Sequence, residues 1–84
     1  MITPEQCRAA RGLLGLSQQD LAARAGVGVV TVHQLEAAIS QPRRATLEVI
    51  KRAFEMAGVE FIDENGGGVG VRLKKGSRSA KSKQ

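Results

Sequence analysis

The amino-acid sequence predicts a mainly α-helical domain of four helices that ends in a short β-hairpin. Two observations predict the helices: apolar residues recur at helical spacing, and capping residues precede the first runs. A third observation predicts the hairpin, because the apolar spacing changes to alternation after residue 58. With 84 residues the chain makes one small domain. Its core must come from Leu, Val, Ile and Ala, because Phe is present only twice and Trp and Tyr are absent.

The first two predicted helices begin at strong capping sequences. Thr3 and Gln6 have the spacing of a capping box, and Pro4 suits the first turn of a helix. Ser17 and Asp20 repeat the capping pattern at the start of the second helix. Glycines that tolerate the left-handed backbone of a helix end follow both runs: they are Gly15 and Gly26.

The third helix is predicted at about 29–36 and the fourth at roughly 43–57, where Gly58 closes it. Each of the four helices has one apolar face at a spacing of three and four residues, so each has one side to bury. The residues predicted to face the core are Cys7, Ala10, Leu14, Leu21, Ala22, Ala25, Val32, Leu35, Leu47, Ile50, Phe54 and Ala57.

The end of the chain reads as two strands, 59–62 and 69–73, with a reversal signal at Asn65 and Gly66. An isolated hairpin is barely stable, so these strands must pack on the helices or pair with another chain. The predicted organisation is a helix-turn-helix domain over 1–58, a β extension and dimer contact over 59–73, and a disordered tail over 74–84.

The second and third predicted helices are short and joined by a tight glycine-containing turn. This arrangement is a helix-turn-helix, which places its second helix in the major groove of DNA. The net charge of +5 is not spread over the chain, because residues 1–71 carry seven Lys and Arg against eight Asp and Glu. All of the excess lies in residues 72–84, which carry six basic residues and no acidic one.

Several function classes are excluded by what the sequence lacks. Cys7 is the one cysteine, so no internal disulfide and no cysteine-based zinc site is expected, and His33 is too far away to help form one. No set of nucleophile, base and orienting group can be assembled, so we expect no enzyme, no catalytic residue and no cofactor. No secretory signal or membrane-spanning run is visible, so a cytoplasmic protein with no membrane partner is expected.

A set of residues in fixed order and spacing resembles a known family. These residues are Leu16-Ser17-Gln18, Leu21-Ala22, Ala25-Gly26-Val27, Thr31-Val32, Leu35-Glu36 and Pro42. They resemble the Cro/CI-type (Xre-family) helix-turn-helix regulators over about residues 4–58. The continuation over 57–73 is similar to a small single-domain subgroup of that family. The resemblance implies a four-helix lambda-repressor-like fold and double-stranded DNA as the partner.

The resemblance also implies roles for single positions. Gln18 occupies the place of a glutamine that binds a phosphate and braces the recognition helix. Arg11 and Glu36 match a partly buried salt bridge between the first and third helices. The remaining implied DNA contacts lie at the start of the recognition helix, one turn further on, and after Pro42: they are Gly28, Val29, Val30 and Thr31, then His33 and Gln34, then Arg43 and Arg44.

The sequence departs from the family pattern at three places. Gly28 stands where Ser or Thr usually caps the recognition helix, so that helix start is weakly capped. In the family pattern a glycine usually stands two residues after the glutamate that corresponds to Glu36. Here that position is Ala38, so the turn is expected to differ or to carry strain. Val29 and Val30 replace a polar or basic pair, so base reading must use apolar contact with thymine methyl groups, with Gln34 able to bind an adenine edge.

Alternatives remain for several of these residues. Val29 and Val30 are also consistent with core positions or with a protein-contact patch, and His33 with a solvated helix position. Cys7 is interpreted as a small buried residue rather than a reactive thiol. The basic tail is consistent with a solvated end or with nonspecific phosphate contacts.

The main hypothesis is a homodimeric, sequence-specific DNA-binding regulator, a repressor or autoregulator, that binds an inverted-repeat operator. One recognition helix covers few base pairs, and two copies on a two-fold axis double the site. We expect 59–73 to supply much of the dimer contact. The alternative hypothesis is a helix-turn-helix scaffold that acts through a protein partner, as an antitoxin or an antagonist of another regulator.

Overall fold

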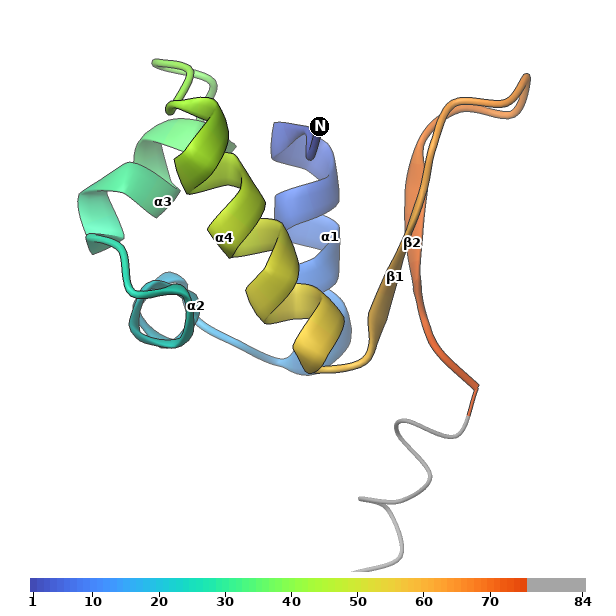
Figure 1. Ribbon diagram of the computed structural model, residues 1–84, viewed down its shortest axis with the longest axis horizontal. Helices are drawn as coiled ribbons and strands as arrows, with labels where there is room; N and C mark the ends of the chain where they lie inside the picture. The colour runs from blue at the N-terminus through green and yellow to red at the C-terminus, as the bar shows by residue number, and fades with distance from the viewer. Residues whose placement is uncertain (76–84) are drawn as a thin grey trace, which may run out of the picture.

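Four helices surround one core, and a two-stranded hairpin lies against one side of them (Figure 1). The structure is a computed structural model and describes residues 1–75. The elements are α1 (Pro4–Leu14), α2 (Gln18–Ala25), α3 (Val29–Glu36), α4 (Arg44–Met56), β1 (Val59–Ile62) and β2 (Gly70–Leu73). This is the predicted mainly α fold. The prediction for the basic tail falls mostly on residues 76–84, outside the described part.

The predicted helix starts of α1 and α2 are both present. The Gln6 amide donates to Thr3 Oγ1 at 3.0 Å and the Thr3 amide donates to Gln6 Oε1 at 3.0 Å. Ser17 and Asp20 form the same reciprocal pair, again at 3.0 Å. Gly15 and Gly26 end the two helices with the left-handed backbone that favours glycine.

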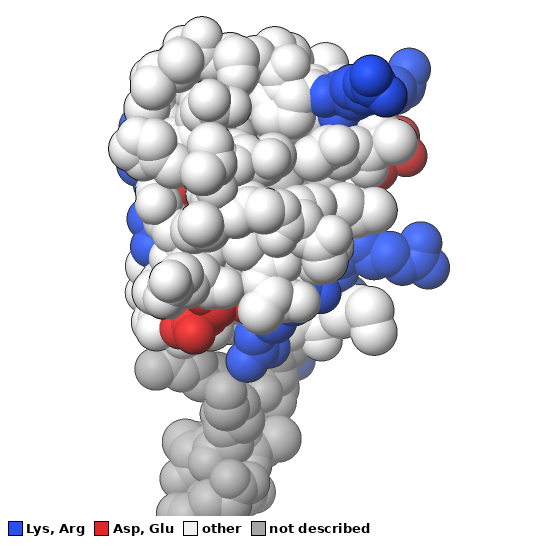
Figure 2. Space-filling view, turned by 90° about the vertical axis from the view of Figure 1, so that its left-hand side faces the viewer, with Lys and Arg blue, Asp and Glu red and all other residues white. Residues whose placement is uncertain are grey.

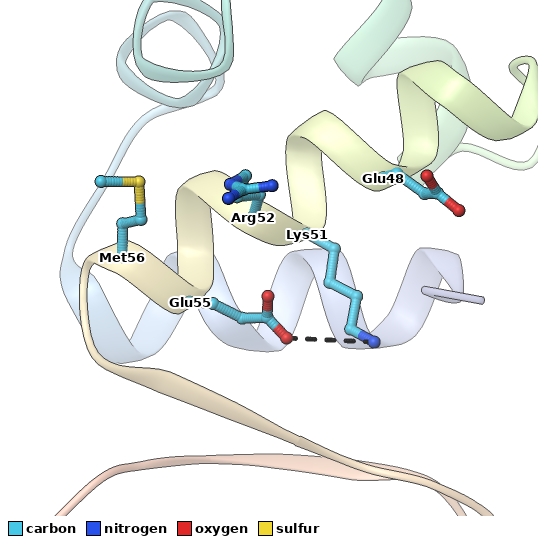
Figure 3. A pocket seen from close by; sticks show the side chains of 5 residues that line it. All are labelled: Glu48, Lys51, Arg52, Glu55 and Met56. Carbon is cyan, nitrogen blue, oxygen red and sulfur yellow. Dashed lines mark ion pairs between the residues drawn. The ribbon is translucent and has the colours of Figure 1, made fainter.

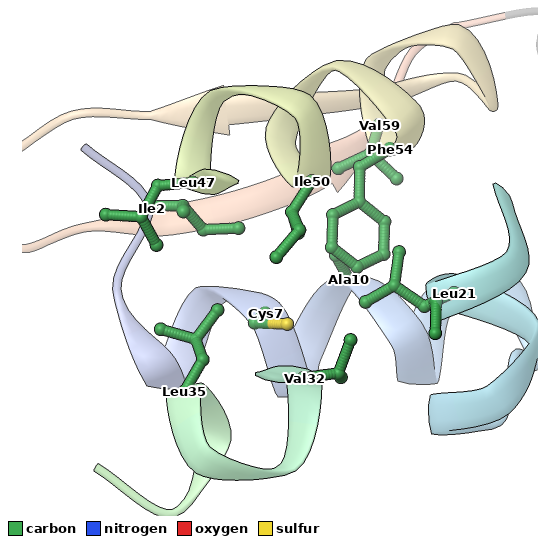
Figure 4. Packing of buried hydrophobic residues seen from close by; sticks show 11 residues of the cluster. Ile2, Cys7, Ala10, Leu21, Val32, Leu35, Leu47, Ile50, Phe54 and Val59 are labelled. Carbon is green, nitrogen blue, oxygen red and sulfur yellow. The ribbon is translucent and has the colours of Figure 1, made fainter. Parts of the chain in front are cut away.

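All four helices contribute to the core (Figure 4). Helix α4 supplies its largest part through an apolar stripe, and α3 presents two residues to α1 and α4. The buried apolar residues are Ile2, Cys7, Ala10, Leu21, Ala22, Val32, Leu35, Leu47, Ile50, Phe54 and Val59. Most were predicted from helical spacing, and Ile2 was missed because it precedes the first helix.

The hairpin is antiparallel, with Val59 opposite Leu73 and Phe61 opposite Val71. These four side chains pack against the helical core. The hairpin is also fastened by one polar side chain, because the buried Gln6 carboxamide donates to the carbonyl of Gly70 at 3.0 Å and to that of Ile62 at 3.4 Å. The hairpin therefore belongs to the same packed unit as α1 and α4.

The loop between α3 and α4 carries the strain that the sequence suggested. Ala38 has φ +57°, and it is the one non-glycine residue with positive φ in residues 1–75. A left-handed backbone costs a residue with a Cβ atom free energy that glycine does not pay. The turn therefore places an alanine in the left-handed region that favours glycine.

Candidate nucleic-acid interface

Helices α2 and α3 form the left-hand side of the molecule in Figure 1, away from the hairpin. Gly26 ends α2, and the Val27 amide donates to the Ala22 carbonyl at 3.0 Å in the turn. Helix α3 then starts at Gly28, which makes no side-chain capping bond because it has no side chain. This turn leaves the first residues of α3 at the surface.

Val29 and Val30 are at the exposed start of α3. Their side chains are 38% and 62% exposed, so they are not part of the core. The inward positions of α3 are taken by Val32 and Leu35, which are buried. Thr31 is half-buried at the same end of the helix. The two valines thus form an apolar patch that is open to a partner.

The surface around this patch carries little charge. Helix α3 contains no Lys or Arg. Figure 2 shows the α2 and α3 side of the molecule, whose centre is largely uncharged, while both basic and acidic side chains lie toward its margins. Contact with phosphates, which needs positive charge, must therefore come from the edge of this surface rather than from α3 itself.

His33 and Gln34 lie one turn further along α3. His33 is exposed, and Gln34 is half-buried. The Gln34 Oε1 atom accepts a hydrogen bond of 3.4 Å from Ser40 Oγ, which leaves the amide NH2 group of Gln34 available as a donor. This long, exposed bond is the side-chain contact between Gln34 and the α3–α4 loop.

Arg43 and Arg44 lie at the start of α4. Both are exposed, and Arg43 is the N-cap residue of the helix. Arg44 Nε is 3.5 Å from Glu48 Oε2, a surface pair of two largely exposed side chains that contributes little to stability. Both guanidinium groups can therefore turn toward a phosphate.

The opposite end of α3 is held by a buried ionic cluster around Glu36. Arg11 from α1 makes two bonds to this carboxylate, Nε to Oε2 at 2.7 Å and Nη2 to Oε1 at 2.8 Å. Gln18 Nε2 donates to Oε1 at 3.0 Å from the start of α2. The Cys7 thiol donates to Oε2 at 3.0 Å. Three helices thus meet on one carboxylate, and Gln18 has the bracing contact that the resemblance implied.

The cluster sets the ionisation of its members. Burial alone would raise the pKa of the Glu36 carboxyl, but the hydrogen bonds from its three neighbours outweigh burial and hold the pKa at about 2. Burial, reinforced by the adjacent carboxylate, raises the pKa of the Cys7 thiol far above its ordinary value. Cys7 therefore stays protonated as a hydrogen-bond donor and is not a reactive thiolate.

The match to a known family agrees with this geometry. A family model described as helix-turn-helix matches residues 8–61, which is more than half of the chain and includes all of α2, α3 and α4. The chain belongs to the Cro/CI-type (Xre-family) helix-turn-helix family. The search of curated proteins found no match.

The helix-turn-helix family consists of DNA-binding transcription regulators and is not a family of enzymes. This fits a protein without catalytic function. Within residues 1–75 no three His, Cys, Asp or Glu side chains are grouped so that they could hold a metal ion. In the same described range, no helix combines the length and apolar character needed to cross a bilayer.

Two contacts of this helix-turn-helix protein were missed by sequence reasoning. Arg8 donates to the backbone carbonyl of Glu36, so a third residue of α1, besides Cys7 and Arg11, bonds to the end of α3. Cys7 was expected only as an apolar core residue, whereas its thiol bonds to a residue 29 positions away. No local pattern signals either contact, because both depend on how α1 crosses α3.

Proposed function

We propose that this protein is a sequence-specific transcription regulator that binds an inverted-repeat operator as a homodimer and represses or autoregulates a promoter. The observation that carries the proposal is the exposed start of α3, where Val30 is 62% exposed, on a helix-turn-helix held rigidly at Glu36. Helix α3 lies in the major groove, as the recognition helix of this motif does. Two copies read half-sites that are about 34–36 Å apart.

Base reading is assigned to the exposed face of α3. Val29 and Val30 contact thymine methyl groups, which are apolar groups in the major groove. The amide of Gln34 binds an adenine edge, and the exposed His33 lies beside it. Gly28 and Thr31 lie at the same helix end and let the backbone approach the DNA.

Phosphate contact is assigned to residues at the margin of the exposed face of α3. Arg43 and Arg44 supply positive charge from the start of α4. Gln18 supplies an amide at the start of α2 while it braces Glu36. Because phosphate contacts position a protein without reading sequence, these residues set affinity and register.

A dimer through the hairpin remains part of this proposal, with a constraint from the packing. The apolar side chains of β1 and β2 face the helices of their own subunit. The outward positions hold Glu60 and Arg72, which pair with each other at 3.1 Å, together with Ile62. A contact between two hairpins must therefore use this mixed face or the strand edges.

Selection of bound sequences from random duplex DNA tests the proposal. The full chain at low salt should enrich an inverted repeat whose half-sites lie one helical turn apart. Lack of any enriched sequence would contradict it and would favour the second candidate function, binding of a protein partner as an antitoxin or antagonist. The observation that favours this second function is the apolar patch of Val29 and Val30 on a face without Lys or Arg in α3.

Substitutions separate base reading from phosphate contact. Gln34→Ala should relax preference at one base pair of each half-site, at a cost of about 1–3 kcal/mol. Arg43→Ala should weaken binding to all sequences alike and lower the salt slope by about one. Replacement of single thymines by uracil in the selected operator removes only methyl groups, and it should weaken binding where the valines make contact. A change of sequence preference in Arg43→Ala would contradict its assignment to phosphate.

A further inference from the structure

Two exposed regions within residues 1–75 carry polar side chains that the proposed function does not use. One is the outward face of α4, where a shallow hollow of about 540 Å³ is lined by side chains that all project from this helix (Figure 3). Lys51 and Glu55 pair with each other there, with Nζ and Oε2 separated by 3.9 Å, as on an ordinary solvated helix. The other region is the loop of the hairpin, residues 63–69, where a carboxylate bonds to backbone amides beside the one asparagine of the chain.

The Glu64 carboxylate lies against the backbone of this loop. Its Oε2 atom accepts hydrogen bonds from the Gly66 amide at 3.3 Å and from the Gly68 amide at 3.2 Å. Gly66 and Gly68 have φ +99° and +89°, in the left-handed region that favours glycine, and this backbone turns both N–H groups toward one oxygen. The carboxylate therefore lies next to the backbone nitrogen that directly follows Asn65 in the chain.

The surroundings of Asn65 and Gly66 leave this peptide bond open to reaction. Both residues are exposed, so water reaches them. Apart from the chain neighbours of Gly66, no atom lies within 4 Å of the place where its Cβ atom would be, so no side chain packs over the bond on that side. Asparagine is a thermolabile residue, because its side-chain carbonyl carbon can form a five-membered ring with the next backbone nitrogen.

We propose that Asn65 is a site of self-modification, at which the chain converts this asparagine to aspartate and isoaspartate with Glu64 as the general base. The Gly66 nitrogen attacks Cγ of Asn65 and gives its proton to the Glu64 carboxylate. The new bond between nitrogen and Cγ closes a cyclic imide. The bond from Cγ to the side-chain NH2 group breaks, and this group leaves as ammonia with the proton that Glu64 held.

Water completes the reaction, which needs no oxidant or reductant. Attack of water at Cγ opens the imide to aspartate. Attack at the main-chain carbonyl carbon of the same residue opens it to isoaspartate, in which the chain continues through the former side chain. Either product replaces a neutral amide by a carboxyl group that is ionised at neutral pH, so the formal net charge of +5 falls by one.

The strands of the hairpin are held independently of this loop. The Gln6 carboxamide donates to the carbonyls of Ile62 and Gly70, which are the residues on either side of the loop. Phe61 and Val71 pack against the helical core. The product is therefore a folded chain with a more acidic hairpin tip. The loop also lies away from α2 and α3 (Figure 1), so the inference does not depend on DNA binding.

Incubation of the full chain in mildly alkaline buffer, with samples digested by trypsin after increasing times, tests the proposal. Asn65 lies in the tryptic peptide 53–72, and mass spectrometry of this peptide measures the change from amide to acid and its position. The same peptide, incubated free, is the reference. The folded chain should be modified several times faster than the free peptide, because the folded loop holds Glu64 at the Gly66 nitrogen. Slower modification in the folded chain would overturn the proposal.

Two substitutions separate the base from the charge of the loop. Glu64→Gln removes the base and should slow the modification about tenfold or more. Asp63→Gln removes the neighbouring charge but not the contact with Gly66, and it should leave the rate unchanged. A rate in Glu64→Gln equal to that of the wild type, or an equal slowing in both variants, would also overturn the proposal. Urea unfolding should give the wild-type midpoint for both variants and for the modified chain, and a lower midpoint of the modified chain would contradict the independence of the strands from the loop.

Discussion

The two ends of α3 are built in opposite ways. The C-terminal end places Glu36 in a buried cluster, where its carboxylate accepts hydrogen bonds from three side chains of α1 and α2. The N-terminal end begins at Gly28, without a side-chain cap, and exposes Val29 and Val30. One end is determined by interior hydrogen bonds, and the other is almost free of them.

This difference indicates how the helix combines rigidity with freedom to vary. Because the orientation of α3 is set at Glu36, the exposed residues at its start are not needed to hold the fold. If they contact bases, as proposed, they can vary with the operator without loss of the fold, and Val29 and Val30 stand where the family resemblance implies a polar or basic pair. Stability and recognition are thus assigned to different turns of the same helix.

The largest expected effect follows from breaking the buried end. Glu36→Gln leaves the Arg11 guanidinium without its counter-charge in a mostly buried site and should lower the free energy of unfolding by about 3 kcal/mol. Urea unfolding at neutral pH measures this loss. Glu55→Gln, which removes the partly exposed ion pair with Lys51, is the control and should cost less than about 0.5 kcal/mol. Equal losses in the two variants would show that the cluster has no special role.

Acid should lower the free energy of unfolding by protonating Glu36 at the buried end of α3. The pKa of Glu36 is lowered from 4.5 to about 2 in the folded protein, so its contribution is fully present above about pH 4.5 and is lost as the pH falls toward 2. A pKa difference of this size corresponds to about 3 kcal/mol. Carboxyl titration by carbon NMR gives the pKa directly. A midpoint near 4.5 for Glu36 would contradict the geometry of the cluster.

A smaller effect is expected directly after the buried end, at Ala38. Ala38→Gly should raise the free energy of unfolding by about 1 kcal/mol, because it relieves the positive φ of +57°. The neighbouring Ala37 has φ −84°, so Ala37→Gly gains nothing and should cost about 0.5–1 kcal/mol through lost backbone entropy. Thermal or urea unfolding compares the two, and stabilisation by both would rule out strain as the cause.

The smallest effect is expected at the open end. Gly28→Ser would add the missing cap of α3, and a Cβ atom there meets only Thr31 Oγ1 at 3.9 Å. The gain should be only about a few tenths of a kcal/mol, since glycine is itself a fair N-cap. Ser17→Gly, at the capped start of α2, should lose a similar amount. Destabilisation by Gly28→Ser would mean that this end is less open than its packing indicates.

Much of the fold could be predicted because its signals are local. The capping pairs at Thr3 and Ser17, the glycines that end α1 and α2, and the helical spacing of the core all act within one or two turns. The contact between Arg11 and Glu36 was expected from the family resemblance and is present.

The remaining contacts depend on tertiary packing. Gln6 was expected only as a capping residue, yet its carboxamide reaches carbonyls in a hairpin more than fifty residues away. The inward orientation of the apolar strand residues likewise follows from where the hairpin meets α1 and α4. Spacing along the chain contains no signal for which residues meet at such distances.

The central claim is that Glu36 anchors α3 while the start of the helix contacts DNA bases. Selection of bound DNA sequences with the Val30→Ala variant tests this claim most directly. The account predicts that this variant unfolds within about 0.5 kcal/mol of the wild type, as expected for an exposed position, and still enriches an inverted repeat. It should lose the preference for thymine at one position in each half-site. An unchanged consensus, or a large loss of stability, would contradict the claim that the start of α3 reads DNA while Glu36 holds the helix.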